Sequence, residues 1–521
     1  MMSTSIAALV LASCVSVVIL ARILKYVKWV WLEPKKLERL LRDQGFKGSP
    51  YRVLVGDLGD NDRLMSEAQS KPIALMDDIA PRVTPLIART LENYGKMSFM
   101  WFGTTPRVNI MDPELVKEIL STKFGDFEKP KNSPAVELLA TGLAHYNGEK
   151  WGKHRRIINP AFHQEKLKLM FPAFSTSCGE LINRWKKLVD STSDPCEVDV
   201  WSEFLDFTGD VIARTAFGSS DEEGRRLFHL QREQADNVIM HRNAVPIPGL
   251  RFLPTKRNLR MREIDKEVRG ILSSIINKKL EAMRLGDARN DDLLGLLLES
   301  NIKLSQEQNN SKGFALTTEE VIEECKLFFF AGQETSSVLL TWAIILLSVN
   351  HDWQSRARQE VFQVFGDENP YLDGLSRLKI MTMIMYEVLR LYPPGDLLIR
   401  QTNKELKLGK VTLPPGVQLC ISLLHIHRDP QIWGEDAGVF KPERFSEGIA
   451  KATGNQVSFY PFGWGPRICI GQSFAIIEFK LALAKILQNF SFELSPAYSH
   501  APRTIIALQP QHGAQVLLRK L

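Results

Sequence analysis

Apolar residues are distributed unevenly along the chain, and the first stretch is the most continuous. Residues 6–21 form an uncharged, mostly apolar run, and three basic residues, Arg22, Lys25 and Lys28, follow it among apolar and aromatic neighbours. Such a run, with flanking lysines that reach the interface, can complete a membrane-spanning helix of about 20 residues. A cleaved signal peptide normally carries its positive charge before the apolar core, whereas here the charge follows it. The pattern predicts an uncleaved signal anchor over residues 1–32, with the rest of the chain in the cytosol.

Behind the anchor, helical patterns dominate. A capping box of Thr317 with Glu320 opens an apolar pattern that predicts a buried helix reaching about Val349, roughly 50 Å long at 1.5 Å per residue. A second pattern, R-L-K-I-M-T-M-I-M-Y-E-V-L-R-L-Y, ends at the proline pair 393–394, where the missing N–H prevents continuation. The segment K-L-G-K-V-T-L-P-P-G-V-Q-L-C-I-S predicts one small β-sheet with Pro-Pro-Gly as a turn. The predicted fold class is mainly α with minor β.

The long predicted helix contains a polar interruption at residues 331–335, with the sequence A-G-Q-E-T. Glycine costs about 1 kcal/mol in a helix interior, and Thr335 can bond back to the carbonyl of Ala331 and bend the axis. A solvent-facing polar patch would also explain these residues, but apolar residues flank them on both sides. The pattern therefore favours a functional distortion inside the protein.

Composition narrows the class of protein. The chain has 521 residues, several times the usual domain length, yet no linker or internal repeat divides it. We therefore expect a single large domain over residues 33–521. The net charge is +6, and Lys and Arg are spread along the chain without a basic block, so nucleic-acid binding is not expected.

The cysteines point to one site. The six lie at positions 14, 178, 196, 325, 420 and 469 and form no C-x-x-C pair, which favours reduced thiols over a zinc site or a disulfide framework. Cys469 alone lies in a patterned segment, P-F-G-W-G-P-R-I-C-I-G, before a helical run whose dipole and N–H groups favour a thiolate. A nucleophile would need a histidine partner that only the fold could bring close. A lone metal ligand suits haem iron, whose other positions are already filled.

The same segment resembles a family signature. Phe462, Gly465, Arg467, Cys469 and Gly471 match the F-x-x-G-x-R-x-C-x-G of the cytochrome P450 haem-thiolate monooxygenases. Three further motifs stand in the family's order: W-x-x-x-R at Trp151 and Arg155, A-G-Q-E-T at 331–335, and E-x-x-R at Glu387 and Arg390 with Arg444 of P-E-R-F. The resemblance covers the chain after the anchor and implies a cytochrome P450-like haem-thiolate fold behind an N-terminal membrane anchor helix.

The resemblance also implies a cofactor, haem b (iron protoporphyrin IX), with the Cys469 thiolate as its axial metal ligand. Arginines could pair with the haem propionates by charge-assisted bonds, and a tryptophan could donate its indole N–H. The expected cofactor-binding residues besides Cys469 are Phe462, Trp151, Arg155, Arg400 and Arg467.

Thr335 and Glu334 are the expected catalytic residues, because an alcohol next to an acid can guide protons and water to the dioxygen. The acid is Glu where many relatives have Asp, which keeps the carboxylate. Glu387 and Arg390 lie one helical turn apart, and we expect a structural ion pair there.

The implied reaction is oxygen insertion into a C–H bond with O2 and two electrons. The chain has no G-x-G-x-x-G after a strand and no recognisable flavin domain, so we expect a separate NADPH–cytochrome P450 reductase at the endoplasmic reticulum membrane. Lys150, Lys153 and Arg156 could steer that acidic partner, or could form a plain solvated face. A haem protein for electron transfer or sensing is the alternative class, but it would not need the polar interruption, so Thr335 favours a monooxygenase.

Other segments resemble the plant clan 72 of the family, especially its A subfamily, whose members oxidise triterpenoids, iridoids of the secologanin route and gibberellins. Three stretches are candidates for setting specificity: 127–144, 246–254 and 394–399. The second is proline-rich and could touch the membrane, or could be a surface turn. We expect a bulky apolar triterpenoid as substrate, with an iridoid or a gibberellin as alternatives.

Overall fold

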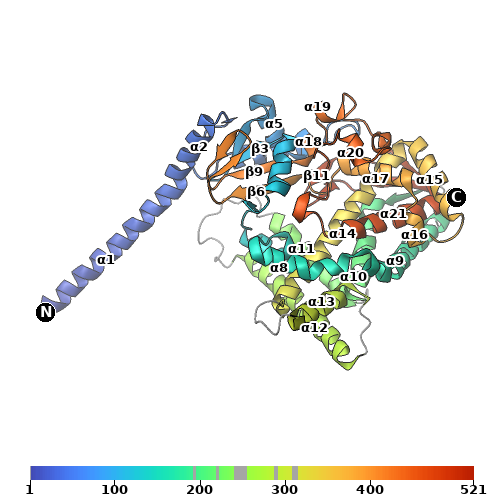
Figure 1. Ribbon diagram of the computed structural model, residues 1–521, viewed down its shortest axis with the longest axis horizontal. Helices are drawn as coiled ribbons and strands as arrows, with labels where there is room; N and C mark the ends of the chain where they lie inside the picture. The colour runs from blue at the N-terminus through green and yellow to red at the C-terminus, as the bar shows by residue number, and fades with distance from the viewer. Residues whose placement is uncertain (1, 192–194, 219–221, 240–254, 287–290, 308–314) are drawn as a thin grey trace.

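The computed structural model describes all residues except 1, 192–194, 219–221, 240–254, 287–290 and 308–314 (Figure 1). Its α-helices are α1 (Met2–Val27), α2 (Glu33–Asp43), α3 (Leu58–Gln69), α4 (Ala80–Val83), α5 (Pro85–Tyr94), α6 (Pro113–Lys117), α7 (Pro134–Leu139), α8 (Gly148–Ile158), α9 (Gln164–Ser191), α10 (Val200–Phe217), α11 (Glu222–Ile239), α12 (Lys256–Leu285), α13 (Leu293–Glu307), α14 (Thr318–Val349), α15 (His351–Phe365), α16 (Leu372–Leu375), α17 (Lys379–Leu391), α18 (Leu423–Ile426), α19 (Pro430–Trp433), α20 (Ile449–Ala452) and α21 (Gln472–Asn489). The π and 3-10 segments are η1 (Lys28–Leu32), η2 (Glu118–Thr122), η3 (Gly142–Ala144), η4 (Asn159–Phe162), η6 (Pro442–Phe445) and η7 (Gly465–Arg467). The predicted fold class, mainly α with minor β, is confirmed.

The strands are β1 (Lys47–Gly48), β2 (Ser98–Phe102), β3 (Thr105–Ile110), β4 (Phe127–Glu128), β5 (Cys196–Asp199), β6 (Leu397–Thr402), β7 (Leu406–Leu408), β8 (Val411–Leu413), β9 (Gln418–Ser422), β10 (Phe490–Leu494), β11 (Pro502–Thr504), β12 (Leu508–Pro510) and β13 (Gln515–Lys520). They form a six-stranded sheet in the order β1-β2-β3-β9-β6-β4, a three-stranded sheet β10-β13-β5, and the pairs β11-β12 and β7-β8. The largest sheet lies near the anchor, and the helical body occupies the rest of the molecule (Figure 1).

The prediction of one small sheet around Pro-Pro-Gly is partly wrong. β7 and β8 do form a hairpin, with Leu406 opposite Leu413. However, β9 pairs with β3 and β6 in the large sheet, so the Pro-Pro-Gly turn joins two different sheets. The N–H of Gly416 donates to the carbonyl of Thr402 at 2.8 Å, and this bond ties the turn to the end of β6.

Helix α14 runs through the middle of the helical body (Figure 1). Thr317 caps it: its hydroxyl accepts the N–H of Glu320, and the Glu320 carboxylate accepts the N–H of Thr317. The helix packs on α10, α12, α17 and α21 and is almost fully buried after Ser336. The predicted long buried helix is confirmed, with the predicted capping box and C-terminus.

The ion pair expected within the second helical pattern is also present. Arg390 on α17 donates two bonds to Glu387, at 2.7 and 2.8 Å, and both side chains are fully buried. Nε of Arg444, in η6, lies 3.4 Å from the same carboxylate. Arg390 also donates to the carbonyls of His427 and Ala437, so the pair ties α17 to the segment that leads toward Cys469.

The N-terminal helix projects from the body as a long rod (Figure 1). The helical rod over Val10–Asp43 contains an apolar window long enough to span a membrane, and this window is not buried in the protein. The helix does not end at residue 32, because α2 continues it through the π segment η1. Tyr51 donates its hydroxyl to the carbonyl of Val30 at 2.6 Å, and this bond fixes the rod to the body.

Candidate active site

Cys469 lies in a tight loop between η7 and α21. Its N–H donates to the carbonyl of Phe462 at 2.8 Å, which closes the loop. Gly465 has φ +70°, and a Cβ there would collide with the carbonyl of Leu120 on η2. Only glycine allows this approach, so the loop backbone passes close to η2 and presents the sulfur ahead of α21.

The Cys469 sulfur lies in a hollow within the protein. The residue is solvent-accessible, yet burial raises the pKa of the thiol, while the N–H of Gly471 and the charges of Arg155 and Lys129 lower it to a smaller extent. Because Cys469 is accessible to solvent while its thiol is strongly desolvated, we infer that protein surrounds the sulfur and leaves a space beside it. Desolvation has the larger effect on the pKa of the thiol, whereas the N–H of Gly471 acts in the direction expected for the start of a helix and favours the thiolate.

Helix α8 carries two of the expected cofactor residues. Arg155 donates to the carbonyl of Ile468, next to Cys469, at 2.9 Å. Trp151 lies one turn earlier on the same face, and the guanidinium of Arg467 lies over its ring at 4.5 Å. The structure thus brings Trp151, Arg155, Arg467, Phe462 and Cys469 together from segments more than 300 residues apart.

A cluster of buried cations lies beside this loop. Burial lowers the pKa of Arg467 to about 10, with the charge of Glu128 acting in the opposite direction. Burial and the charge of Arg467 lower the pKa of Arg400, on β6, to about 10. Burial and the charges of both arginines lower the pKa of Lys129 to about 7, against the charge of Cys469. Sequence reasoning missed Lys129, because no motif marks a lysine in the segment F-E-K-P.

This cluster fits a cofactor that bears carboxylates. The charge of Arg467 lowers the pKa of both Arg400 and Lys129, and Nε of Arg467 is buried without a hydrogen-bond partner among the described residues. Buried cations need anionic partners, and two propionate groups would supply them. A thiol with an internal space beside it and a cationic edge are the features that a haem requires. The residues present therefore fit haem.

The polar interruption of α14 opens toward an internal space. Ala331 and Thr335, one turn apart, are exposed although the helix is otherwise largely buried. Thr335 donates its hydroxyl to the carbonyl of Ala331 at 2.7 Å, as predicted. The helix is nevertheless continuous. Gly332 also has a packing role, since a Cβ there would lie 2.9 Å from Cδ1 of Ile212 on α10.

Glu334 interacts with a different element from its neighbour. Burial raises its pKa to about 7, while the charge of Arg232 lowers it and that of Asp236 raises it. Both of those residues lie on α11, so Glu334 faces α11, whereas Thr335 lines the internal space. The two expected catalytic residues are adjacent in sequence but lie in different environments. An acid with a pKa near neutrality can both take up and release a proton.

A second buried acid lies behind this segment and was missed by sequence reasoning. Glu478 on α21 is 1% exposed, and neither carboxylate oxygen has a hydrogen-bond partner among the described residues. Burial raises its pKa to about 8, and the nearby Ser336 hydroxyl on α14 lowers it slightly. Glu478 therefore lies between the helix that follows Cys469 and the helix that carries Thr335.

Glu478 should make stability depend on pH. A carboxyl whose folded-state pKa lies above its usual 4.5 stabilises the fold fully below 4.5 and loses that contribution as pH rises through about 8. The loss amounts to a few kcal/mol over this window. We expect Glu478→Gln, which is uncharged at every pH, to flatten the dependence of the unfolding midpoint on pH between about 5 and 8. The measurement is thermal unfolding followed by circular dichroism. The exposed Glu165→Gln is the matched control, and an unchanged slope for Glu478→Gln would contradict the buried state.

The candidate specificity stretches have different outcomes. Residues 127–144 span β4, α7 and η3, and residues 394–399 lead into β6. The stretch 246–254 lies outside the described residues. Near Ala331, α7, α11 and α12 share a buried apolar cluster, with half-buried side chains of α7, α14 and the β11–β12 turn packed on it. The cluster consists of Leu139, Ala235, Val238 and Met261, with Ala135, Val136, Leu138, Phe330 and Ile506 against it.

The basic residues of α8 are partly neutralised within the chain. Lys150 and Lys153 lie 3.5 and 3.3 Å from the Glu320 carboxylate of α14. Nζ of Lys150 also lies over the ring of Tyr146 at 4.0 Å. These contacts weaken the hypothesis that the two lysines steer a partner.

Comparisons with known proteins agree with this geometry. The sequence model of one family, described as Cytochrome P450, matches residues 85–518. Similar curated proteins include "Cytochrome P450 CYP72A616" of Paris polyphylla, 59% identical over 495 residues, which are 95% of each chain. "Cytochrome P450 CYP72A219" of Panax ginseng is 54% identical over 514 residues, 98% of this chain and 99% of the relative. "7-deoxyloganic acid hydroxylase" of Catharanthus roseus is 53% identical over 501 residues, 95% of this chain and 96% of the relative.

Proposed function

The chain belongs to the cytochrome P450 family, as a monooxygenase of the CYP72A type, and on this premise we propose that it inserts oxygen into a C–H bond of a bulky apolar plant terpenoid. The first candidate substrate is a triterpenoid. The substrate class rests on the apolar cluster described above, which includes Phe330, the residue before the exposed Ala331 of α14. Among the described residues, this cluster contains aliphatic and aromatic side chains from α7, α11, α12, α14 and the β11–β12 turn.

The family binds haem b through an axial cysteine thiolate, and we assign that role to Cys469. Arg467, Arg400 and Lys129 would hold the propionates, because these desolvated like charges lie close together and an anionic group would offset their repulsion. The assignment extends to Arg155, Trp151 and Phe462, which orient the loop around the sulfur. Bound haem supplies the activation of O2 and accepts the electrons.

The chain's own residues would manage the protons. Thr335 presents its hydroxyl at the internal space, where it can hold a water or pass a proton. Glu334, with a pKa of about 7, can collect protons on the side of α11, where Arg232 lies. Because the two side chains face different environments, a water between them would have to carry the proton from Glu334 to Thr335.

Iridoid oxidation is the second candidate, and a named relative favours it, since 7-deoxyloganic acid hydroxylase is 53% identical to the chain. A desolvated cation near the apolar cluster of α7, α11 and α12 supports this second candidate. Burial lowers the pKa of Arg503 on β11, against the charge of Asp236, and its Nε is buried without a hydrogen-bond partner among the described residues. This cation could receive the carboxylate of an acidic terpenoid.

The family relationship implies a redox partner reductase, O2 and an organic substrate. We propose a membrane-bound NADPH–cytochrome P450 reductase as that partner and the endoplasmic reticulum as the membrane. Residues 1–32 would be the signal anchor, which the apolar rod supports, and residues 33–521 the cytosolic catalytic domain.

A product screen tests the substrate proposal. Microsomes containing the chain and a plant reductase are given panels of triterpenoids, iridoids and gibberellins, with and without NADPH, and products are detected by mass spectrometry. We expect an NADPH-dependent product one oxygen heavier in the triterpenoid panel. A product from the iridoid panel alone would replace that assignment with the second candidate. If no panel reacts while the reduced carbon monoxide spectrum shows thiolate-ligated haem, the terpenoid proposal is overturned and the family assignment stands.

A further inference from the structure

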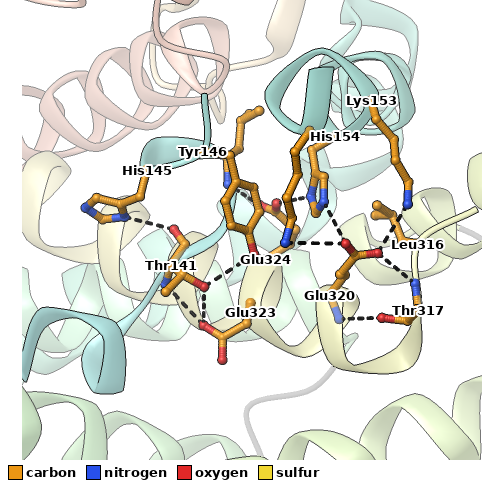
Figure 2. Close-up of polar contacts among 12 residues, drawn as sticks. Thr141, His145, Tyr146, Lys153, His154, Leu316, Thr317, Glu320, Glu323 and Glu324 are labelled. Atoms are coloured by element: carbon orange, nitrogen blue, oxygen red, sulfur yellow. Dashed lines mark hydrogen bonds and ion pairs between the residues drawn. The ribbon is translucent and has the colours of Figure 1, made fainter. Parts of the chain in front are cut away.

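A buried polar cluster joins α8, α14 and the loop from Thr141 to Asn147, and the reaction described above does not use it (Figure 2). Its centre is His154 on α8, which is fully buried and points toward the carboxylates of α14. His154 lies one residue before Arg155, which donates from α8 to the loop of Cys469. The cluster therefore lies between the cofactor site and the start of the central helix.

His154 bonds to two acids of α14. Its Nδ1 lies 2.6 Å from the Glu324 carboxylate, and its Nε2 lies 3.4 Å from that of Glu320. The ring of Tyr146 packs against the imidazole edge-on, with 4.6 Å between ring centroids. Glu324 is also fully buried, so removing the histidine would leave one buried carboxylate oxygen without its hydrogen-bond partner.

Glu324 and its neighbour Glu323 hold the loop. Oε2 of Glu324 accepts the N–H of Leu143 at 3.0 Å, and Oε2 of Glu323 accepts both the N–H and the hydroxyl of Thr141 at 3.1 and 2.7 Å. Gly142 between them has φ +57°, and a Cβ there would lie 2.8 Å from Oε2 of Glu324. The loop is thus pressed onto α14 by hydrogen bonds that only a glycine at this position permits.

The other end of the loop holds the cofactor-edge cations. Arg467 donates to the carbonyl of Tyr146 at 2.9 Å and to Oδ1 of Asn147 at 3.1 Å. Lys129 donates through Nζ to the carbonyl of Ala144 and through its N–H to Oδ1 of Asn147 at 3.0 Å. One short loop therefore contacts α14 at its start and both cations at its end.

We propose that His154 is a positioning residue for the monooxygenase reaction: by fixing Glu324 and Tyr146, it holds the loop of residues 141–147 on α14 and thereby sets the places of Lys129 and Arg467. The part that concerns the cations rests on their proposed role toward the cofactor. Glu324 also precedes Ala331 by seven residues of one rigid helix, about 10 Å. His154 thus couples the cofactor edge to the segment that carries Thr335.

A plain structural role is the competing explanation, because removing one partner of a buried, hydrogen-bonded pair destabilises the whole fold. The two explanations differ in where the effect appears. A positioning role predicts changes confined to the loop, the cofactor edge and electron coupling. A structural role predicts a uniform loss of stability.

The test uses the full-length protein with its haem in nanodiscs containing a plant reductase. The variants are His154→Phe, which keeps the ring against Tyr146, Glu324→Gln, which tests the same bond from the other side, and His154→Gln, which restores a donor. Lys153→Gln is the matched control, since it touches only the outer carboxylate, Glu320. Hydrogen exchange of peptides covering residues 141–147, imidazole binding by the shift of the haem absorption band, and the peroxide released per NADPH are measured.

We expect His154→Phe and Glu324→Gln to speed exchange of the 141–147 amides by about tenfold or more, to alter imidazole affinity and to raise the share of NADPH lost to peroxide. Exchange in α17 should stay unchanged, and His154→Gln should recover most of the effect. Unchanged loop exchange, or an equal rise in α17, would overturn the proposal. Loop exchange and imidazole binding do not need the terpenoid substrate, and the carbon monoxide spectrum of the unmodified protein reports separately on the haem assignment.

Discussion

Replacing Cys469 with alanine should abolish thiolate-ligated haem and with it all NADPH-dependent product. The sulfur is the one accessible thiol within the catalytic body among the described residues, and Arg155 and Lys129 surround it with positive charge. A metal deprotonates a coordinating thiol outright, so the raised pKa of the free thiol does not oppose this role. We expect product formation to fall by more than about 1000-fold, equivalent to over ~4 kcal/mol of transition-state stabilisation.

The measurement is the reduced carbon monoxide difference spectrum together with product formation from the reactive panel. Cys178→Ala is the matched control, because Cys178 is a fully buried core residue on α9. That variant should lose only a small packing contribution to stability and should keep the spectrum. Retention of the thiolate spectrum in Cys469→Ala would refute the assignment of the ligand.

Replacing Thr335 with alanine should separate NADPH use from product formation. Thr335 is exposed on α14, as is Ala331 one turn earlier, and it follows Glu334, whose pKa is about 7. Losing one proton-transfer group typically costs about 100-fold or more in the step it serves. We expect NADPH oxidation to continue, product per NADPH to fall by at least about tenfold, and peroxide release to rise.

Two control variants separate the hydroxyl from the helix geometry. Thr335→Ser keeps the hydroxyl and should keep most of the coupling. Thr341→Ala removes an equivalent bond, from Oγ1 to the carbonyl of Ser337 at 2.7 Å, on the buried part of the same helix. This variant should not change the ratio of product to NADPH. Equal coupling in Thr335→Ala and the unmodified protein would exclude a role for Thr335 in proton delivery.

Several features could be predicted because they depend on neighbours in sequence. The capping box at Thr317, the stop of α17 before the proline pair and the Glu387–Arg390 pair all follow from spacing within one or two helical turns. The bond from Thr335 to Ala331 has the same origin. The hydrogen bond that closes the Cys469 loop, from its N–H to the carbonyl of Phe462, is local as well.

The sequence by itself thus determined the family, the mainly α fold, the apolar anchor pattern and the segments that carry chemistry. Only the tertiary structure decided what surrounds each group. It brought Lys129 close to Arg400, Arg467 and Cys469, turned Glu334 toward Arg232, buried Glu478 beside Ser336 and set His154 between two carboxylates. It also desolvated the Cys469 thiol. Desolvation and charge–charge interactions depend on distances between segments that are remote in sequence, and packing alone sets those distances.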